Sequence, residues 1–270
     1  MTLNLASSSR IQHSFKSLER NPRVPRGVLL VAYIYKVVSC QLLAGLTVLL
    51  FTMPSMAASP LATGDTGMLD PGGWEFTAFV AGEKRDSIES YNAPAVEAVY
   101  GTSANTTVTV AAARQVLDES DAGPRSGWGN ASAEIKWRFF NSDGKALAFA
   151  PSYSHPLSHS ATIRGLIEDS SILHLPRIAS IERGDWILTG QVAYDITSDS
   201  FNGIGYGVWT GYSWTDSMLL LAEIYGEEIS GDNENGGATN WRLGFEYGIG
   251  NSATVLFSGG SRLRSDLPHA

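Results

Sequence analysis

The chain has 270 residues and a formal net charge of −8, with 28 glycines and a single cysteine, Cys40. An acidic balance does not suit a nucleic-acid-binding protein, which needs a basic face, so we expect no nucleic-acid partner. One cysteine cannot form an intrachain disulfide or a cysteine metal site, and the sequence contains no cofactor-binding fingerprint. We therefore expect no cofactor.

The first 57 residues differ from the rest of the chain in charge and hydropathy. They contain six basic residues and one acid, whereas the remainder has 13 basic and 26 acidic residues. A basic segment ending at Lys36 precedes the apolar stretch 37–51, and small residues then occupy the −3 and −1 positions of a cut after Ala57. This layout is typical of a secretory signal peptide. We predict a signal helix within 1–57, cleavage near Ala57, and export.

Two other interpretations of this segment stay open. An uncleaved anchor would run over 28–51, but Lys36 would then cost about 2.5–3.5 kcal/mol if it lay at the centre of the span. A lipoprotein cleavage box at 37–40 would leave the apolar stretch 41–51 on the mature protein. If cleavage instead follows Ala57, Cys40 is removed and the mature chain contains no thiol.

Beyond the signal segment, residues 58–71 are predicted to be a linker, and no later stretch is apolar and long enough for a membrane helix. Eleven short segments have the composition or alternation of β-strands instead. In chain order they are 73–81, 93–101, 106–116, 131–139, 145–153, 172–181, 186–196, 204–214, 217–228, 239–248 and 252–260. Pro176 weakens the prediction that the sixth is a regular central strand.

Alternation along these segments separates two faces. One face is rich in aromatic residues: Trp74, Trp137, Phe139, Trp186, Tyr194, Trp241 and Tyr247. The opposite face is polar or charged: Glu75, Glu134, Lys136, Arg138, Gln191, Glu223 and Arg242. Which face points inward decides the class of protein, because a soluble barrel buries its apolar face and a membrane barrel turns that face to lipid.

The composition of the two faces favours the membrane alternative. The apolar face is mainly alanine, aromatic residues and single aliphatic residues, not the dense Leu, Ile, Val and Phe of a dry core. An Arg or Lys turned to lipid would cost about 2–4 kcal/mol at mid-bilayer. We therefore predict that the charged set faces an aqueous lumen and that the aromatic set faces lipid or forms interfacial girdles.

The links between the predicted strands alternate between long and short. The long ones are 82–92, 117–128, 154–171, 197–203 and 228–238, and the short ones are 101–105, 141–144, 182–185, 214–217 and 248–252. An up-and-down meander places successive links at its two ends, and outer-membrane barrels have short turns at one end and larger loops at the other. The links therefore predict an antiparallel up-and-down transmembrane β-barrel.

The order of these features resembles a bacterial outer-membrane family named for the MetA pathway of phenol degradation, whose members are transporter-like β-barrels. The matching segments are WEFTAFV (74–80), NAPAVEAVYGTSANTTVTV (92–110), SGWGNASAEIKWRFF (126–140), ALAFAPSYSHP (146–156), GDWILTGQVAYD (184–195) and LLLAEIYGE (219–227). The resemblance covers roughly 72–260. It implies no catalytic residue.

The resemblance also implies a barrel of about twelve strands in the outer membrane of a Gram-negative bacterium. Its expected partners are membrane lipid, the outer-membrane barrel assembly machinery, and small, apolar or aromatic solutes. We assign the barrel to 72–264 and a tail to 265–270. Because only eleven strands are found and no closing strand ends in an aromatic residue, either the last strand is missing or the count is one short.

Two clusters resemble metal or catalytic sites. His155 and His159 have helical metal-ligand spacing, but Pro156 predicts a loop, and in 232–236 the glycine falls one place too early for a calcium loop. We predict no metal site and no enzyme. The preferred function is a channel or transporter. The alternatives are an outer-membrane lipid hydrolase that uses serine and histidine of the rim loop 152–160, and a secreted β-barrel domain without transport.

Overall fold

The structure is a computed structural model that describes residues 29–30, 61–85, 88–119, 123–198, 202–230, 235–250 and 253–265. Apart from Leu29–Leu30, the predicted signal segment lies outside the described residues, so its helix, its cleavage and the two other interpretations remain predictions. The predicted tail lies outside them as well, except for Ser265, which ends the last strand.

The described chain is all-β apart from one short helix, α2 (His159–Ile163). Its strands are β1 (Leu29–Leu30), β2 (Trp74–Arg85), β3 (Ile88–Ser103), β4 (Thr106–Glu119), β5 (Gly123–Ser142), β6 (Lys145–Phe149), β7 (Ser152–Pro156), β8 (Ile172–Arg183), β9 (Trp186–Thr197), β10 (Asn202–Thr215), β11 (Met218–Ser230), β12 (Asn235–Ile249) and β13 (Ala253–Ser265). From β2 onward all pairing is antiparallel and the strands follow their order in the sequence, except that β6 and β7 each pair with both β5 and β8, and this order confirms the predicted up-and-down sheet.

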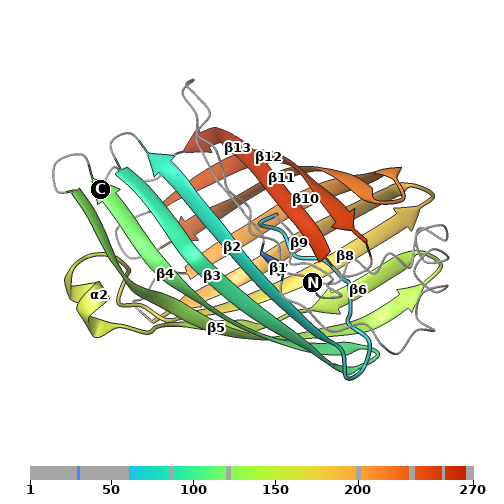
Figure 1. Ribbon diagram of the computed structural model, residues 1–270, viewed down its shortest axis with the longest axis horizontal. Coiled ribbons are helices and arrows are strands. Elements are labelled where there is room, and N and C mark those ends of the chain that lie inside the picture. The colour runs from blue at the N-terminus through green and yellow to red at the C-terminus, as the bar shows by residue number, and fades with distance from the viewer. Residues whose placement is uncertain are drawn as a thin grey trace.

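The twelve antiparallel strands occupy eleven positions in the sheet. Strands β6 and β7 both lie between β5 and β8, one after the other, and so share a single position. The predicted segment 145–153 is this interrupted strand. The sheet curls into a barrel-like shape (Figure 1), with its two faces toward the inside and the outside of the curl.

Side chains of β2 and β13, the first and last antiparallel strands, are in contact. Phe79 of β2 packs against Ala253 and Leu256 of β13, the last strand of the sheet. Strand β1 pairs in parallel with β2, opposite Thr77 and Ala78, and contacts β13 as well. Because β1 lies in the predicted signal segment, it would be absent from the mature sheet if cleavage follows Ala57.

The predicted lengths of the links were largely wrong. Strands extend through most of 82–92, 117–128, 197–203 and 228–238, and only 157–171, which contains α2, is a long link. Antiparallel pairing continues there because polar side chains support it: Lys84 pairs with Glu89, and Arg125 Nη2 lies 2.7 Å from Glu119 Oε2. The two ends of the sheet therefore differ in the link 157–171 and in the polar extensions of the strands, and not in a general alternation of link length.

Pro176 was predicted to weaken a regular central strand, and the strand does form with an irregular ladder beside the proline, whereas the prediction of a loop at Pro156 was wrong. Pro176 lies within β8, and Ser152–Pro156 form β7. On one side, Pro176 lies opposite the interruption between β6 and β7, where the Ala150 amide donates to the Pro176 carbonyl. The missing N–H of proline therefore falls where the ladder is already irregular, which is where a proline is tolerated in a strand.

The seam between β2 and β13 provides a test of packing. Leu256 is 1% exposed and Leu263, on the same strand, is 59% exposed. We expect Leu256→Ala to lower the free energy of unfolding by about 2–5 kcal/mol, because a buried leucine loses contacts and leaves a cavity. Leu263→Ala is the matched control and should cost clearly less. Denaturant titration of the folded protein measures both, and equal costs would contradict the assignment of Leu256 to the packed interior.

Candidate functional site

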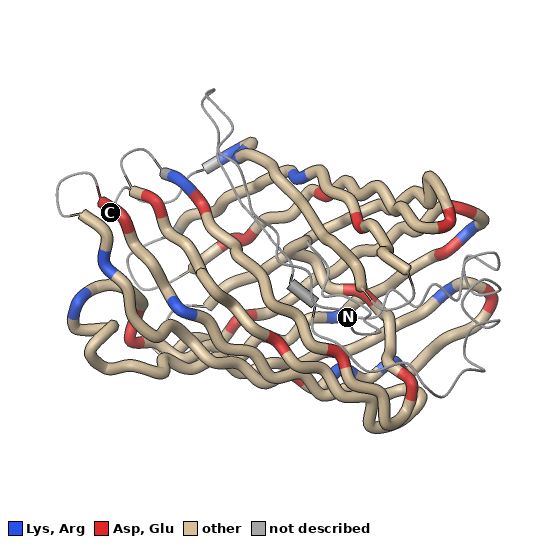
Figure 2. Tube along the Cα trace, viewed as in Figure 1, with Lys and Arg blue, Asp and Glu red and all other residues tan. Residues whose placement is uncertain are grey.

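Residues on the charged face of the strands lie inside the curled sheet. The side chains of Glu75, Lys136, Glu223 and Arg242 are buried, and those of Glu134, Arg138 and Gln191 are half-buried. Charged residues occur along the length of the strands and not only at their ends (Figure 2). The seven residues predicted to face a lumen are thus all on the inner side of the sheet.

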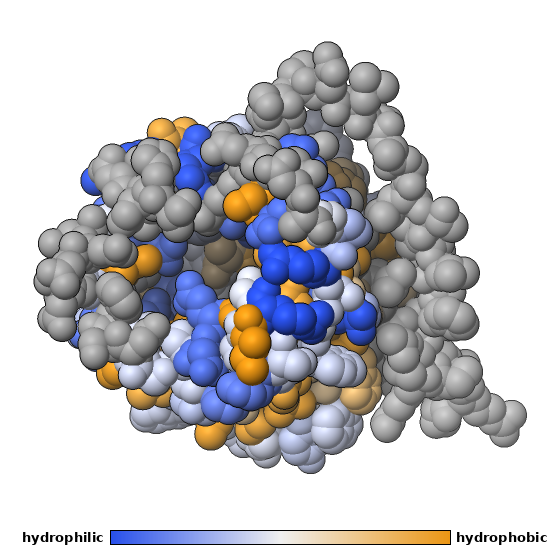
Figure 3. All heavy atoms as spheres, turned by 90° about the vertical axis from the view of Figure 1, so that its left-hand side faces the viewer, coloured by the Kyte–Doolittle hydropathy of each residue, from blue (hydrophilic) through white to orange (hydrophobic). Residues whose placement is uncertain are grey.

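Residues on the aromatic face lie on the outside. All seven of the predicted girdle residues are exposed: Trp74, Trp137, Phe139, Trp186, Tyr194, Trp241 and Tyr247. The contrast is sharpest between chain neighbours, since Lys136 is 7% exposed and Trp137 is 54% exposed. Seen from the end at which α2 lies, hydrophilic residues gather around the hollow of the molecule (Figure 3).

Many of the outer aromatic residues lie close to the short turns. These turns directly follow β3, β5, β8, β10 and β12, and we call this end of the sheet the turn end. Trp74 lies opposite Tyr100 with ring centroids 4.7 Å apart, and Trp186 lies opposite Tyr212 with the same separation. Sequence analysis did not single out Tyr100 or Tyr212, because the cross-strand register that pairs them with tryptophan depends on the fold.

A chain segment that was predicted to be a linker occupies the interior. We call residues 61–70 the inner segment. It has no regular secondary structure, yet six of its side chains are buried: Leu61, Thr63, Asp65, Thr66, Met68 and Leu69. Leu61 packs with Ile187, Trp209, Leu219 and Leu221, which form an apolar patch on the inner face of β9–β11. Sequence alternation gave no indication of this packing.

Glu223 binds the start of the inner segment. Its two carboxylate oxygens accept hydrogen bonds from the backbone amides of Ala62, at 3.1 Å, and Thr63, at 2.6 Å. Arg242 Nη1 lies 3.6 Å from the same carboxylate, and Arg242 Nη2 donates to the Tyr225 hydroxyl at 2.8 Å. A buried carboxylate is tolerated when a cation and hydrogen-bond donors surround it, so the inner segment helps to compensate the charge of Glu223.

The opposite wall holds the middle of the inner segment. Lys136 Nζ lies 3.5 Å from Asp65 Oδ1, and both side chains are about nine-tenths buried. Arg138 donates to the Thr66 carbonyl from the same strand, β5. On the far side, the Gly64 amide donates to Gln191 Oε1 at 2.8 Å, and the Trp209 indole donates to the Gly64 carbonyl at 3.2 Å. The inner segment therefore bridges the interior from β5 to β9–β11.

Two wall glycines allow the inner segment to approach the strands closely. A Cβ at Gly207 of β10 would lie 1.8 Å from Thr63 Oγ1, and one at Gly101 of β3 would lie 2.2 Å from the Asp70 carbonyl oxygen. Side chains at these positions would collide with the inner segment. The absence of a side chain at each position therefore fits the path that the segment takes.

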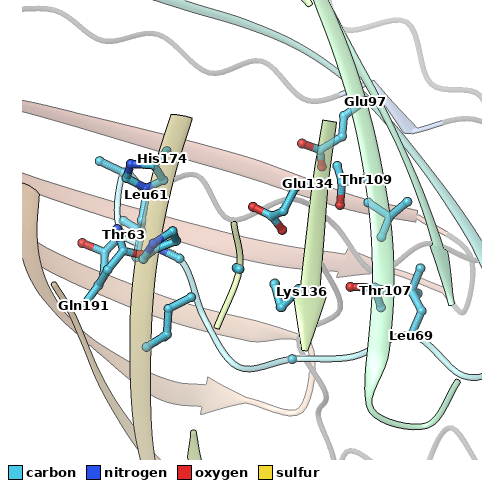
Figure 4. A pocket seen from close by; sticks show the side chains of 17 residues that line it. Leu61, Thr63, Leu69, Glu97, Thr107, Thr109, Glu134, Lys136, His174 and Gln191 are labelled. Atoms are coloured by element: carbon cyan, nitrogen blue, oxygen red, sulfur yellow. The ribbon is translucent and has the colours of Figure 1, made fainter. Parts of the chain in front are cut away.

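A cavity of about 260 Å³ lies between the inner segment and the wall. Its volume is just below the range of about 300–1,000 Å³ typical of small-molecule sites. Glu97, Glu134 and Thr109 lie on one side of it, and His174 and Gln191 lie on the other, together with Leu61 and Thr63 of the inner segment (Figure 4). Glu97, which sequence analysis did not select, brings a second carboxylate beside that of Glu134.

The histidine clusters do not form a metal site in the described part of the chain, where no group of three metal-ligating side chains is found. His155 Nδ1 lies 2.8 Å from Ser171 Oγ, and His159 begins α2. Most of the acidic stretch 232–236 lies outside the described residues, and its last two residues begin β12. The histidine nearest to the cavity is His174, which pairs with Asp195.

The hydrolase alternative requires a serine hydroxyl bonded to a histidine. Ser152 lies opposite His174 in the register of β7 and β8, but no hydrogen bond joins these two side chains. His155, in the predicted rim loop, bonds to Ser171 instead of to a serine of 152–160. Within the described residues, the hydrolase hypothesis therefore lacks the contact between nucleophile and base on which it depends.

Comparisons with known proteins do not assign a family. No family model matches the chain, and it matches no curated protein. The resemblance to the MetA-pathway family therefore stays a prediction. In the part of the chain that the structure describes, no helix is long and apolar enough to cross a membrane.

The contact between Glu223 and the inner segment can be tested by hydrogen exchange. Glu223→Gln keeps the shape of the side chain but removes its charge, and charge-assisted hydrogen bonds are about twice as strong as neutral ones. We expect the amides of residues 62 and 63 to exchange faster. If each bond weakens by about 0.7 kcal/mol and both break in the same opening, the opening is favoured by about 1.4 kcal/mol and exchange is about tenfold faster. Mass spectrometry of the peptide that contains the inner segment measures this change.

The matched control is Glu228→Gln on the same strand, because Glu228 is exposed and lies 3.5 Å from Arg264, away from the inner segment. It should leave these amides unchanged. Equal exchange in both variants and in the unaltered protein would show that Glu223 does not hold the inner segment.

Proposed function

We propose that this protein is an outer-membrane β-barrel channel that passes small solutes through its interior. The observation that carries the proposal is the sidedness of the sheet: large apolar side chains are exposed on the outside and charged side chains are buried inside. A soluble barrel has the reverse arrangement, because its apolar side chains form the core. Lipid around the outer face and water within the lumen satisfy both faces.

The distance between outer aromatic residues on one strand matches the height of the apolar band of an outer-membrane barrel, which supports this proposal. On β9, Trp186 and Tyr194 are eight residues apart, and on β5 Trp137 and Trp128 are nine apart, all four being exposed. At about 3.3 Å per residue these intervals are about 26–30 Å along the strand. With a strand tilt of about 35–45° the height is about 19–24 Å, close to the apolar band of about 25 Å in outer-membrane barrels.

The two ends of the sheet differ, and this difference supports an orientation of the barrel in the membrane. Beyond Trp128 the strands continue with polar side chains and ion pairs, such as that between Arg125 and Glu119. The long link 157–171, which contains α2, lies at this same end, and the larger loops of outer-membrane barrels lie outside the cell. We place the turn end in the periplasm and the end with α2 outside the cell, after export by the signal peptide and insertion by the barrel assembly machinery.

The cavity is where we place the solute. Its lining mixes carboxylates and hydroxyl groups with aliphatic side chains, including Leu69, Val99 and Ile178. Such a lining suits small solutes with both apolar and polar parts, in agreement with the solute class that the family resemblance implies. Membership of the MetA-pathway family is part of this proposal. A secreted barrel domain without transport would share the strand order but has no use for an exposed apolar belt.

A charge placed in the apolar belt tests the membrane assignment. Val110 lies on the outer face of β4, opposite Ala98 and Ala133 and between the two aromatic rows. If this face contacts lipid, Val110→Arg should destabilise the inserted barrel by about 2–4 kcal/mol. The measurement is refolding into lipid vesicles in a denaturant series, with the folded fraction read from its heat-modifiable migration on gels.

The same substitution outside the belt is the control. Val116 lies on β4 beyond Arg114, which is the position paired with Trp128. Near the interface an arginine costs about 0–1 kcal/mol, so Val116→Arg should be tolerated. If both variants are equally stable, or if the protein stays folded and soluble without detergent, the outer face does not contact lipid.

The two cavity carboxylates provide a test of conduction. Acidic side chains along a pore favour cations, so the double variant Glu97→Gln with Glu134→Gln should lower the cation-to-anion permeability ratio. The reversal potential in planar bilayers under a salt gradient measures this ratio, with Glu228→Gln as a control of equal chemistry outside the cavity. Absence of conductance steps from the folded protein would overturn the proposed function, and an unchanged ratio would place the cavity off the solute path.

A further inference from the structure

The inner segment lies across the path that a solute would take. It contacts β5 on one side of the interior and β9–β11 on the other, so it divides the space that the sheet encloses. It also supplies six of the 17 residues that line the cavity: Leu61, Ala62, Thr63, Gly64, Gly67 and Leu69. We propose that this segment is a resident constriction that sets the size limit for solutes, an inference that rests on the proposed function.

The contacts of the inner segment favour a fixed position. Its removal would leave Glu223 with Arg242 but without its two amide donors, and would leave Lys136 without Asp65. Each of these charged groups is buried, and a buried charge that loses a partner is strongly destabilising. The segment therefore stays in place during passage, and solutes pass beside it through the cavity.

The inner face of the strands is complementary in shape to the inner segment. The side chain of Thr63 fills the space above Gly207, the indole of Trp209 donates to the Gly64 carbonyl, and Leu61 fills the apolar patch. This match involves apolar packing, hydrogen bonds and ion pairs on three or more strands, which is more than a linker that lies loosely in a pore would make. The segment begins only three residues after the predicted cleavage site at Ala57, so the mature chain would begin with its own constriction.

Deletion of residues 61–70 tests the size limit. Swelling of liposomes in a series of sugars of increasing size gives the largest sugar that passes. We expect the deletion variant to pass sugars that the unaltered protein excludes. An unchanged limit in a deletion variant that still migrates as a folded barrel would overturn the proposal.

A disulfide tests whether the segment stays in place, and does not depend on the deletion variant folding. A Cβ built at Gly207 lies 3.0 Å from Thr63 Cβ, so the two Cβ atoms must move apart by about 0.5 Å to reach the separation of about 3.5–4.5 Å found in disulfides, and replacement of Thr63 removes the hydroxyl with which this Cβ would collide. We expect Thr63→Cys with Gly207→Cys to form a disulfide and to keep the same sugar limit before and after reduction, because the mature chain has no other thiol. Thr63→Cys alone is the control for the loss of the threonine.

The outcomes separate the two proposals. If oxidation blocks sugars that pass after reduction, the segment must move for passage and is not a resident constriction. If the two cysteines do not pair, the segment does not lie against β10 and the constriction is overturned. If the disulfide forms but no variant, including the deletion, passes any sugar, the channel function fails, and with it the size limit.

Discussion

The structure depends on one constraint: each strand of this sheet lies between two different surroundings. A β-strand directs successive side chains to opposite faces. A one-residue shift in register would therefore move Lys136 to the outer face and Trp137 to the inner face, and would move every other side chain of the strand in the same way. The buried partners of Lys136 and Glu223 and the exposed rows of aromatic residues are compatible with a single register. Sidedness therefore fixes the register of the strands and, through it, the position of every group in the interior.

The parts of the fold that follow from alternation could be predicted from the sequence. Trp186, Leu188 and Val192 lie on one side of a strand whose other side includes Thr189 and Gln191, and all three are exposed in the structure. The same pattern in 131–139 placed Glu134 and Lys136 on one side. Such local patterns do not depend on neighbouring strands. The positions of the strands and the two faces of each strand could therefore be predicted, whereas the lengths of the links could not.

Features that depend on distant contacts could not be predicted in this way. The inner segment has no alternation, and contacts with residues far away in the sequence give it a defined place, such as the hydrogen bonds of its amides to Glu223, about 160 residues away. Trp209 is an exception to the outward tryptophans, and its inward position is explained by the Gly64 carbonyl and the apolar patch. The ends of strands were missed for a related reason, because ion pairs such as that of Lys84 with Glu89 form only after two strands pair.

The interior combines charges that a wide aqueous pore would solvate with packing that resembles a protein core. Glu223 and Arg242 are almost completely buried, so water alone does not stabilise them, and the inner segment supplies two of the hydrogen bonds of Glu223. The same segment covers the apolar patch of Ile187, Leu219 and Leu221, which would otherwise face the lumen. A barrel with this inner wall therefore needs the segment for two physical reasons: compensation of buried charge and cover for apolar surface. Under the proposed channel function, the volume left beside it, and not the full width of the sheet, is then the space available to a solute.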